Sequence, residues 1–238
     1  MRSFLFSSKA QITNTKSSDF IDRSTKCMKW FCVVMLACTS FAIKVIAQER
    51  SSYKVIIIGD SITEGYGVAK EKAYPALLMN QLNSSTNQKI PVKNYQVINA
   101  GIAGATTAGC LQRVQWSFKS GKADLVILAL GANDGLRGLQ PMQSEKNLSD
   151  AIQWVKEQKS KVILFGMQMP PNYGGKYRKE FEKIYTHLQT KHKIDLLPLF
   201  IKDVAGRPEL NQADGIHPNE KGHEIIAKTV LQFLEGKL

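Results

Sequence analysis

Short apolar runs alternate with longer amphipathic patterns from residue 53 to the end of the chain. Five of these runs predict buried strands, at residues 55–58, 95–98, 125–130, 162–165 and 194–197. Apolar positions spaced three and four apart predict helices over residues 73–83, 106–119, 145–159, 176–192 and 220–235. Continuously apolar strands that alternate with helices indicate a parallel sheet covered on both faces. Right-handed crossovers then make a three-layer αβα sandwich, with a flavodoxin-like five-stranded sheet.

The first 47 residues do not follow this pattern. Residues 1–27 are polar, and an apolar run from Trp30 to Ile43 follows Met28-Lys29. A basic start, a short apolar run and small residues at the end are typical of a secretory signal. Val45 and Ala47 fit cleavage before Gln48. We therefore expect residues 1–47 to be an N-terminal extension and signal peptide, and residues 48–238 to be one exported domain, periplasmic or secreted.

Three other interpretations of this segment stay open. Met28 offers an alternative start, which would leave residues 1–27 untranslated. The apolar run is shorter than the roughly 20 residues of a membrane span and Lys44 interrupts it, but an uncleaved anchor is a second interpretation. A lipoprotein is the third, because Met35-Leu36-Ala37 precedes Cys38.

The charge and cysteine content of residues 48–238 differ from those of the whole chain. The chain has 238 residues, is 43% hydrophobic and 22% charged, and carries a formal net charge of +12. These values exclude a mainly disordered chain. Residues 48–238 keep 25 basic and 18 acidic residues, with no clustered basic stretch that would indicate nucleic-acid binding. Cys27, Cys32 and Cys38 precede the expected cleavage site, so Cys110 alone remains and no internal disulfide is expected.

Ligand sites of such sheets lie at the carboxyl ends of the strands, so the loops after the strands are where chemistry is expected. After the first strand, Ser61 and Glu64 have the spacing of a helix capping box. The same serine is also placed to be an activated nucleophile at a strand-to-helix turn. Both interpretations of this loop are kept.

The loops after the second and third strands contain candidate donors to an oxyanion. Gly104 precedes a predicted helix and is able to present its N–H there, although a flexible turn is the alternative. Asn133 is able to point its side-chain amide at a developing negative charge, or to make an Asx-turn. Asp134-Gly135 is interpreted as turn chemistry without a catalytic role.

Near the C-terminus, Asp214 and His217 lie three residues apart in a predicted loop. A carboxylate at this spacing orients a histidine and stabilises its imidazolium, as the base of a nucleophilic serine requires. A surface turn before the last helix is the alternative. No metal site is predicted, since HxxxH, CxxC and carboxylate clusters are missing.

Taken together, Gly59-Asp60-Ser61, Gly104, Asn133 and Asp214-x-x-His217 resemble the four sequence blocks of the SGNH (GDSL-type) hydrolases, in order and in spacing. The resemblance covers about residues 53–234. It is greatest for the branch of thioesterase I, arylesterase and lysophospholipase L1.

The resemblance implies Ser61 as nucleophile, His217 as general base and acid, and Asp214 as the partner of His217. It implies an oxyanion hole made by Ser61, Gly104 and Asn133, and substrate contacts from Asp60, Leu136, Met169 and Pro170. The implied enzyme is a monomeric ester hydrolase that needs no metal or cofactor. It is expected to act through an acyl-enzyme on Ser61. Its expected substrates are small-molecule or lipid acyl esters and thioesters, such as aryl esters, short- to medium-chain acyl esters or lysophospholipids, with at most peripheral membrane contact. A carbohydrate O-deacetylase and a non-catalytic flavodoxin-like binding module are the alternatives.

Overall fold

The computed structural model describes residues 52–238, which form one compact unit. The expected signal peptide and its cleavage site lie outside the described residues. Five parallel strands form one sheet in the order β2-β1-β3-β4-β5. Their bounds are β1 Tyr53–Gly59, β2 Tyr95–Gly101, β3 Leu125–Ala129, β4 Lys161–Phe165 and β5 Asp195–Leu197.

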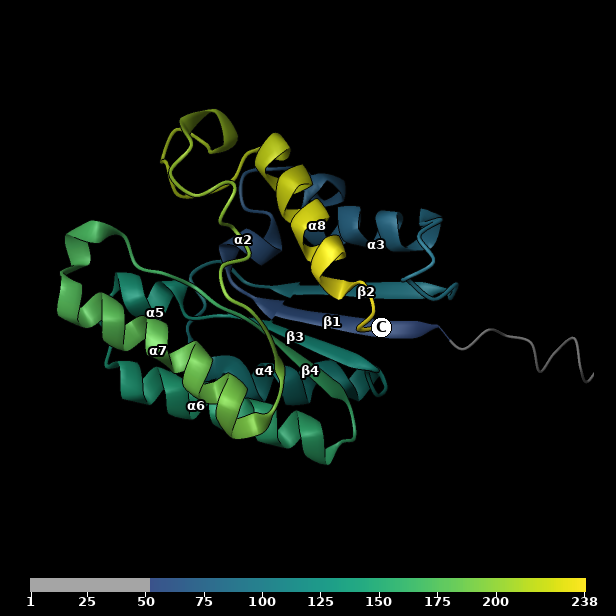
Figure 1. Ribbon diagram of the computed structural model, residues 1–238, viewed down its shortest axis with the longest axis horizontal. Coiled ribbons are helices and arrows are strands. Elements are labelled where there is room, and N and C mark those ends of the chain that lie inside the picture. The colour runs from purple at the N-terminus through teal and green to yellow at the C-terminus, as the bar shows by residue number, and fades with distance from the viewer. Residues whose placement is uncertain (1–51) are drawn as a thin grey trace, which may run out of the picture. The chain divides into compact units, whose positions relative to one another are not determined.

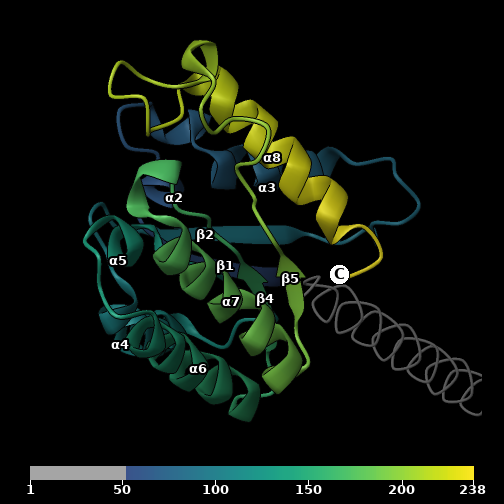
Figure 2. The ribbon, with the colours of Figure 1, turned by 60° about the vertical axis from the view of Figure 1, so that its left-hand side comes forward.

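Helices cover both faces of the sheet (Figures 1 and 2). On one face lie α3 (Tyr74–Ser84) and α8 (Glu220–Leu234), which pack on each other. On the other lie α4 (Cys110–Ser117), α6 (Pro141–Glu157) and α7 (Gly175–His192). This arrangement confirms the predicted αβα sandwich with a five-stranded parallel sheet.

Burial on both faces explains why the strands are continuously apolar. Residues 55–58 of β1 and 125–128 of β3 are completely buried in the centre of the sheet. Helices cover both faces at these positions, which favours apolar side chains throughout the centre of both strands. Within residues 52–238, no helix is long and apolar enough to cross a membrane.

The predicted elements agree with the observed ones apart from their ends and two short helices. Helix α6 begins four residues before its predicted start, because Pro141 occupies its first turn, where the missing N–H costs nothing. The two short α-helices that were not predicted are α2 (Ser61–Glu64) and α5 (Ala132–Leu136), besides single 3-10 turns at residues 70–72, 171–173 and 208–210. Both lie at the carboxyl ends of strands, and both carry candidate site residues.

The histidines outside the candidate site have structural surroundings. His223 of α8 is completely buried, and its Nδ1 accepts a hydrogen bond from the backbone N–H of Tyr74 at 3.2 Å. Burial lowers the pKa of His223 to about 4, so the ring is neutral near pH 7. His192 bonds the hydroxyl of Ser149, and His187 lies beside Glu145.

Candidate active site

Ser61 is the first residue of the one-turn helix α2, directly after β1. The residue that caps this helix is Asp60, whose Oδ1 accepts the N–H of Ile62 at 3.1 Å. Glu64 does not reach back to the helix start, because its carboxylate accepts the N–H of Ala103 in the next loop at 2.8 Å. The capping-box interpretation of Ser61 and Glu64 is therefore wrong. Since Asp60 supplies the cap, the Ser61 hydroxyl is left for other partners.

Close packing requires glycine where α2 sits on the strand ends. A Cβ at Gly59 would overlap the side chain of Thr63, and a Cβ at Gly101 would overlap the backbone of Glu64. The missing side chains thus let α2 sit directly on β1 and β2. Asp60 is buried in this turn, and burial raises its pKa to about 6, against the opposing effect of the hydrogen bond from Ile62.

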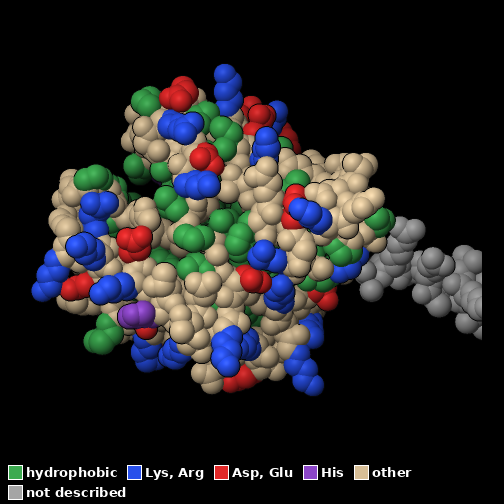
Figure 3. Space-filling view, viewed as in Figure 1, with side chains coloured by type: hydrophobic (Ala, Val, Ile, Leu, Met, Phe, Trp, Pro, Cys, Tyr) green, Lys and Arg blue, Asp and Glu red, His purple; other side chains and the backbone are tan. Residues whose placement is uncertain are grey.

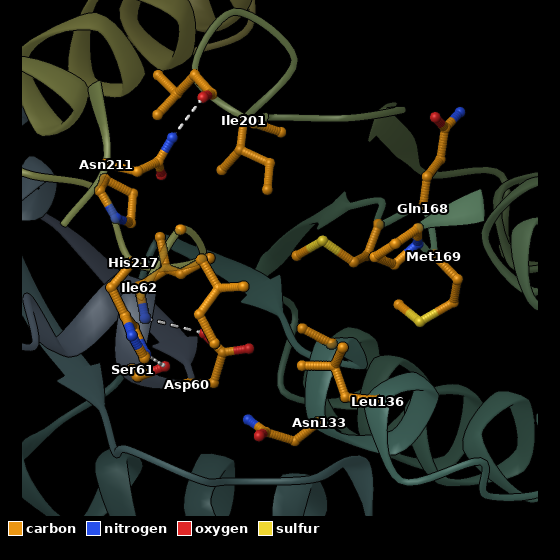
Figure 4. A pocket seen from close by; sticks show the side chains of 18 of the residues that line it. Asp60, Ser61, Ile62, Asn133, Leu136, Gln168, Met169, Ile201, Asn211 and His217 are labelled. Atoms are coloured by element: carbon orange, nitrogen blue, oxygen red, sulfur yellow. Dashed lines mark hydrogen bonds between the residues drawn. The ribbon is translucent and has the colours of Figure 1, made fainter. Parts of the chain in front are cut away.

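Ser61, His217 and Asp214 form one chain of hydrogen bonds. The Nε2 of His217 lies 3.0 Å from the Ser61 hydroxyl, and its Nδ1 lies 2.6 Å from Oδ2 of Asp214. Figure 4 shows the His217 ring directed at Ser61. The two residues are 156 positions apart in sequence, so only the fold brings them together.

Asp214 is held as an anion by its own turn. Its Oδ1 accepts the backbone N–H groups of Ile216 and His217, each at 3.0 Å. These bonds and the His217 side chain lower the pKa of Asp214 to about 2. The ring of Tyr66 packs against His217 with centroids 4.7 Å apart and covers its other side. The imidazole is therefore fixed in both tilt and tautomer, with a proton on Nδ1 facing the carboxylate.

The three expected oxyanion donors meet at the mouth of one pocket, which Ser61, Gly104 and Asn133 all line. Ser61 opens a helix, so its backbone N–H has no acceptor within that helix. Among the described residues, the N–H of Gly104 has no backbone acceptor either. One N–H of the Asn133 amide donates to the carbonyl of Ala105 at 3.1 Å, which leaves its second N–H for the pocket.

Asp134 ties the loops that carry Gly104 and Asn133 to each other. It is buried, and its carboxylate accepts the backbone N–H of Thr107 at 2.9 Å and the Thr107 hydroxyl at 2.5 Å. The hydroxyl of Ser144 in α6 donates to it at 2.9 Å. The interpretation of Asp134 as turn chemistry is therefore wrong: its side chain bonds residues 27 and 10 positions away.

The hydrogen bonds between Asp134 and Thr107 join two loops whose strands are not neighbours in the sheet. Gly104 follows β2 and Asn133 follows β3, and β1 lies between these two strands. No hydrogen bond of the sheet joins β2 to β3, so the spacing of the two donors depends on side chains. Arg137 adds a further tie, since its guanidinium donates to the carbonyl of Gly104 at 3.0 Å.

An apolar pocket of about 680 Å³ opens beside Ser61 and His217. Its volume lies in the range of small-molecule sites. Figure 4 shows Leu136 and Met169 facing Ser61 across this space, and Figure 3 shows hydrophobic side chains gathered in the hollow. Asp60 and Pro170 also line it. Thus eight of the nine expected site residues line one pocket, and Asp214 lies behind His217.

The second wall of the pocket was not predicted. It comes from the segment between β5 and α8, which contributes Leu199, Ile201, Val204 and Ile216. The available signal was the apolar run Leu199-Phe200-Ile201, which follows the short fifth strand after Pro198 and has no helical pattern. On the opposite wall, which contains Leu136 and Met169, the Met169 side chain packs against Gly135. A Cβ at Gly135 would overlap the sulfur of Met169.

An αβα sandwich with a serine, a histidine and an aspartate bonded in series at the carboxyl edge of its sheet has the architecture of a serine-dependent hydrolase. Residues 57–225 match the GDSL-like lipase/acylhydrolase family. The chain belongs to this family and is a carboxylic ester hydrolase, which confirms the resemblance seen in its sequence.

Named relatives agree with this assignment. The arylesterase of Vibrio mimicus is 36% identical over 188 residues, which cover 79% of this chain and 91% of the relative. Thioesterase 1/protease 1/lysophospholipase L1 of Escherichia coli K12 is 36% identical over 181 residues, with 76% and 83% covered. The crystal structure of TesA superposes with a TM-score of 0.72 at 35% identity, with 78% of this chain and 99% of that one covered. Since these proteins are enzymes, a non-catalytic binding module is set aside.

Proposed function

We propose that the protein hydrolyses acyl esters or thioesters, such as aryl esters, short- to medium-chain acyl esters or lysophospholipids, through an acyl-enzyme on Ser61. The observation that carries this proposal is the hydrogen-bonded series Ser61–His217–Asp214 at the mouth of an apolar pocket. The apolar walls favour an acyl chain over the polar groups of a sugar. The relatives named as arylesterase, thioesterase and lysophospholipase support the same substrate classes.

The reaction follows from the positions of these groups. Ser61 Oγ attacks the acyl carbonyl while its proton passes to Nε2 of His217, and Asp214 stabilises the imidazolium that forms. The carbonyl oxygen becomes negative and is stabilised by the N–H groups of Ser61, Gly104 and Asn133. His217 then protonates the departing alcohol or thiol. A water molecule attacks the acyl-enzyme with His217 as base, which releases the acid and restores Ser61.

Two measurements on the full chain test this proposal together. A fluorophosphonate is expected to add covalently to Ser61, as a mass increase on the peptide that contains it. Hydrolysis rates are then compared across p-nitrophenyl esters of increasing acyl length, matched thioesters and acetylated sugars. We expect acyl esters to be preferred over acetylated sugars, because the pocket walls are apolar. Preference for acetylated sugars would instead establish the O-deacetylase alternative, and labelling elsewhere would reject Ser61.

The tie between Thr107 and Asp134 is expected to position the oxyanion donors. Thr107→Val removes the hydroxyl that bonds Asp134, whereas Thr107→Ser keeps it. We expect kcat to fall roughly tenfold in the valine variant with KM changed less than about twofold, because the loop that carries Gly104 is then positioned less precisely for the reaction. The serine variant is expected to retain most of kcat. A lower melting temperature with unchanged kcat in Thr107→Val would show that the tie only stabilises the fold.

A further inference from the structure

Lysines gather at the amino edge of the sheet, opposite the pocket. Five segments meet there: residues 85–94, 118–124, 156–161, 191–195 and 235–238. We call the surface that these segments form the lysine face. Its ten lysines are exposed or half-buried: Lys89, Lys93, Lys119, Lys122, Lys156, Lys159, Lys161, Lys191, Lys193 and Lys237.

Hydrogen bonds join these segments into one surface. The Nζ of Lys161 donates to the carbonyl of Lys237 at 2.7 Å, and the N–H of Gly236 donates to the carbonyl of Lys89 at 3.0 Å. Lys156 reaches the carbonyl of His192 at 2.6 Å. Figure 1 places the start of β1 and the C-terminus at this end, and Figure 3 shows several Lys or Arg side chains there.

The face is strongly positive once opposing charges are counted. Its segments contain four acidic residues, of which Asp195 pairs with Lys161 at 3.3 Å and Glu235 pairs with Lys89 at 3.6 Å. Ten lysines against four acidic residues leave an excess of six positive side-chain charges on this face. Helix dipoles reduce the contrast with the opposite edge, because each helix C-terminus here offsets about half a positive charge and each helix N-terminus there adds about half.

The carboxyl edge of the sheet, around the pocket, has no excess of basic over acidic side chains. The loops around the pocket, residues 60–73, 102–109, 130–142, 166–179 and 198–220, contain eight basic and eight acidic residues. The excess of basic over acidic side chains among the described residues therefore lies at the amino edge of the sheet. The lysines of this face are dispersed along the sequence, so no clustered basic stretch marks them there.

We propose that the lysine face binds an anionic phospholipid surface. Each lysine close to such a surface adds to the attraction, so a group of this size is enough for peripheral binding. A cavity of about 340 Å³ within the face is lined by three lysines, Lys156, Lys161 and Lys193, and by one carboxylate, Asp195, so cations outnumber anions around it.

Nucleic acid is a poorer match for the same face. Single strands bind through bases stacked on aromatic rings. Here Lys93 lies over the ring of Tyr53 at 4.1 Å, and Lys237 lies over the ring of Phe233 at 4.7 Å. Lysines thus cover these ring faces.

The lysine face also leaves the pocket at the far edge open, so a protein bound in this way takes its ester from the aqueous side.

The test measures binding of the full chain to phosphatidylcholine vesicles with and without phosphatidylglycerol, at low and high salt. The affinity for vesicles with phosphatidylglycerol is divided by the affinity for vesicles without it. This ratio isolates the electrostatic part of binding, because any contribution from the apolar run Trp30–Ile43 is common to both kinds of vesicle. We expect a ratio well above one that falls as salt rises. Equal affinity for both kinds of vesicle would overturn the proposal.

Two triple variants locate the binding surface. In the first, Lys119, Lys122 and Lys159 of the lysine face are replaced by glutamine; their side chains make no hydrogen bond or ion pair with the described residues. In the matched control, Lys176, Lys179 and Lys183 of α7 are replaced in the same way. The first variant is expected to lose roughly tenfold to a hundredfold of the affinity for anionic vesicles, and the control much less. Equal losses would show that only net charge matters, which rejects the lysine face.

Two further readouts separate this inference from the catalytic one. Both triple variants, and the wild type bound to vesicles, are expected to hydrolyse a soluble p-nitrophenyl ester at the wild-type rate. Inhibition by anionic vesicles would mean that the pocket edge, and not the lysine face, meets the membrane. Tighter binding to single-stranded DNA than to anionic vesicles at equal salt, lost in the first variant alone, would assign the face to nucleic acid.

Discussion

Ser61→Ala is expected to abolish ester hydrolysis while the protein stays folded. Loss of the nucleophile in a comparable triad costs about 10⁶-fold in kcat, because the oxyanion donors and His217 then have only water to activate. The Ser61 side chain is only partly buried and bonds His217 alone among the described residues. Its removal should therefore leave the melting temperature close to that of the wild type.

The measurement is the hydrolysis of a p-nitrophenyl ester, with circular dichroism melting as the check on folding. Ser84→Ala is a matched control, since Ser84 is exposed at the end of α3 and distant from the pocket in sequence and fold. The variant should also resist the fluorophosphonate. If Ser61→Ala keeps more than about a tenth of the wild-type kcat, another nucleophile carries the reaction.

Asn133→Ala is expected to lower kcat by about 10²–10³-fold, the typical cost of one lost oxyanion donor. The effect should fall mainly on kcat, because the Asn133 amide contributes most when the oxygen becomes negative in the transition state. KM should change far less. The rate of Ser61 phosphonylation should fall with kcat, since that reaction also places negative oxygen among the same donors.

Asn133 also bonds Ala105, so its loss has a structural component that needs a separate measurement. A small fall in melting temperature is expected and does not bear on the oxyanion role. Asn80→Ala, an exposed position on α3, controls for the substitution itself. A change confined to KM or to the melting temperature would remove Asn133 from the oxyanion hole.

Long elements and the identity of the site residues were predictable because each leaves a local pattern. Runs of β-branched apolar residues predict the strands, and apolar residues spaced three and four positions apart predict the long helices. The four sequence blocks place Ser61, Gly104, Asn133, Asp214 and His217 in order. Such signals depend on the residues of one segment and on the physical properties of their side chains.

The helices α2 and α5 were missed because they are too short for an amphipathic period. Helix α2 forms because Asp60 caps it and because two glycines let it rest on the strand ends. These causes involve other segments, which a local pattern does not report. The same holds for Asp134, which has the local signature of a turn and bonds a neighbouring loop.

The sequence by itself determined the sandwich, the family and the residues at the strand ends. Only the tertiary structure decided which of these side chains touch, how the pocket acquires its second wall and where the charges lie. The lysines show the physical reason. They are dispersed in sequence, but in a parallel sheet every helix returns to the amino edge before the next strand begins. Lysines at helix ends, which the helix dipole favours, are thereby brought together on one side of the molecule.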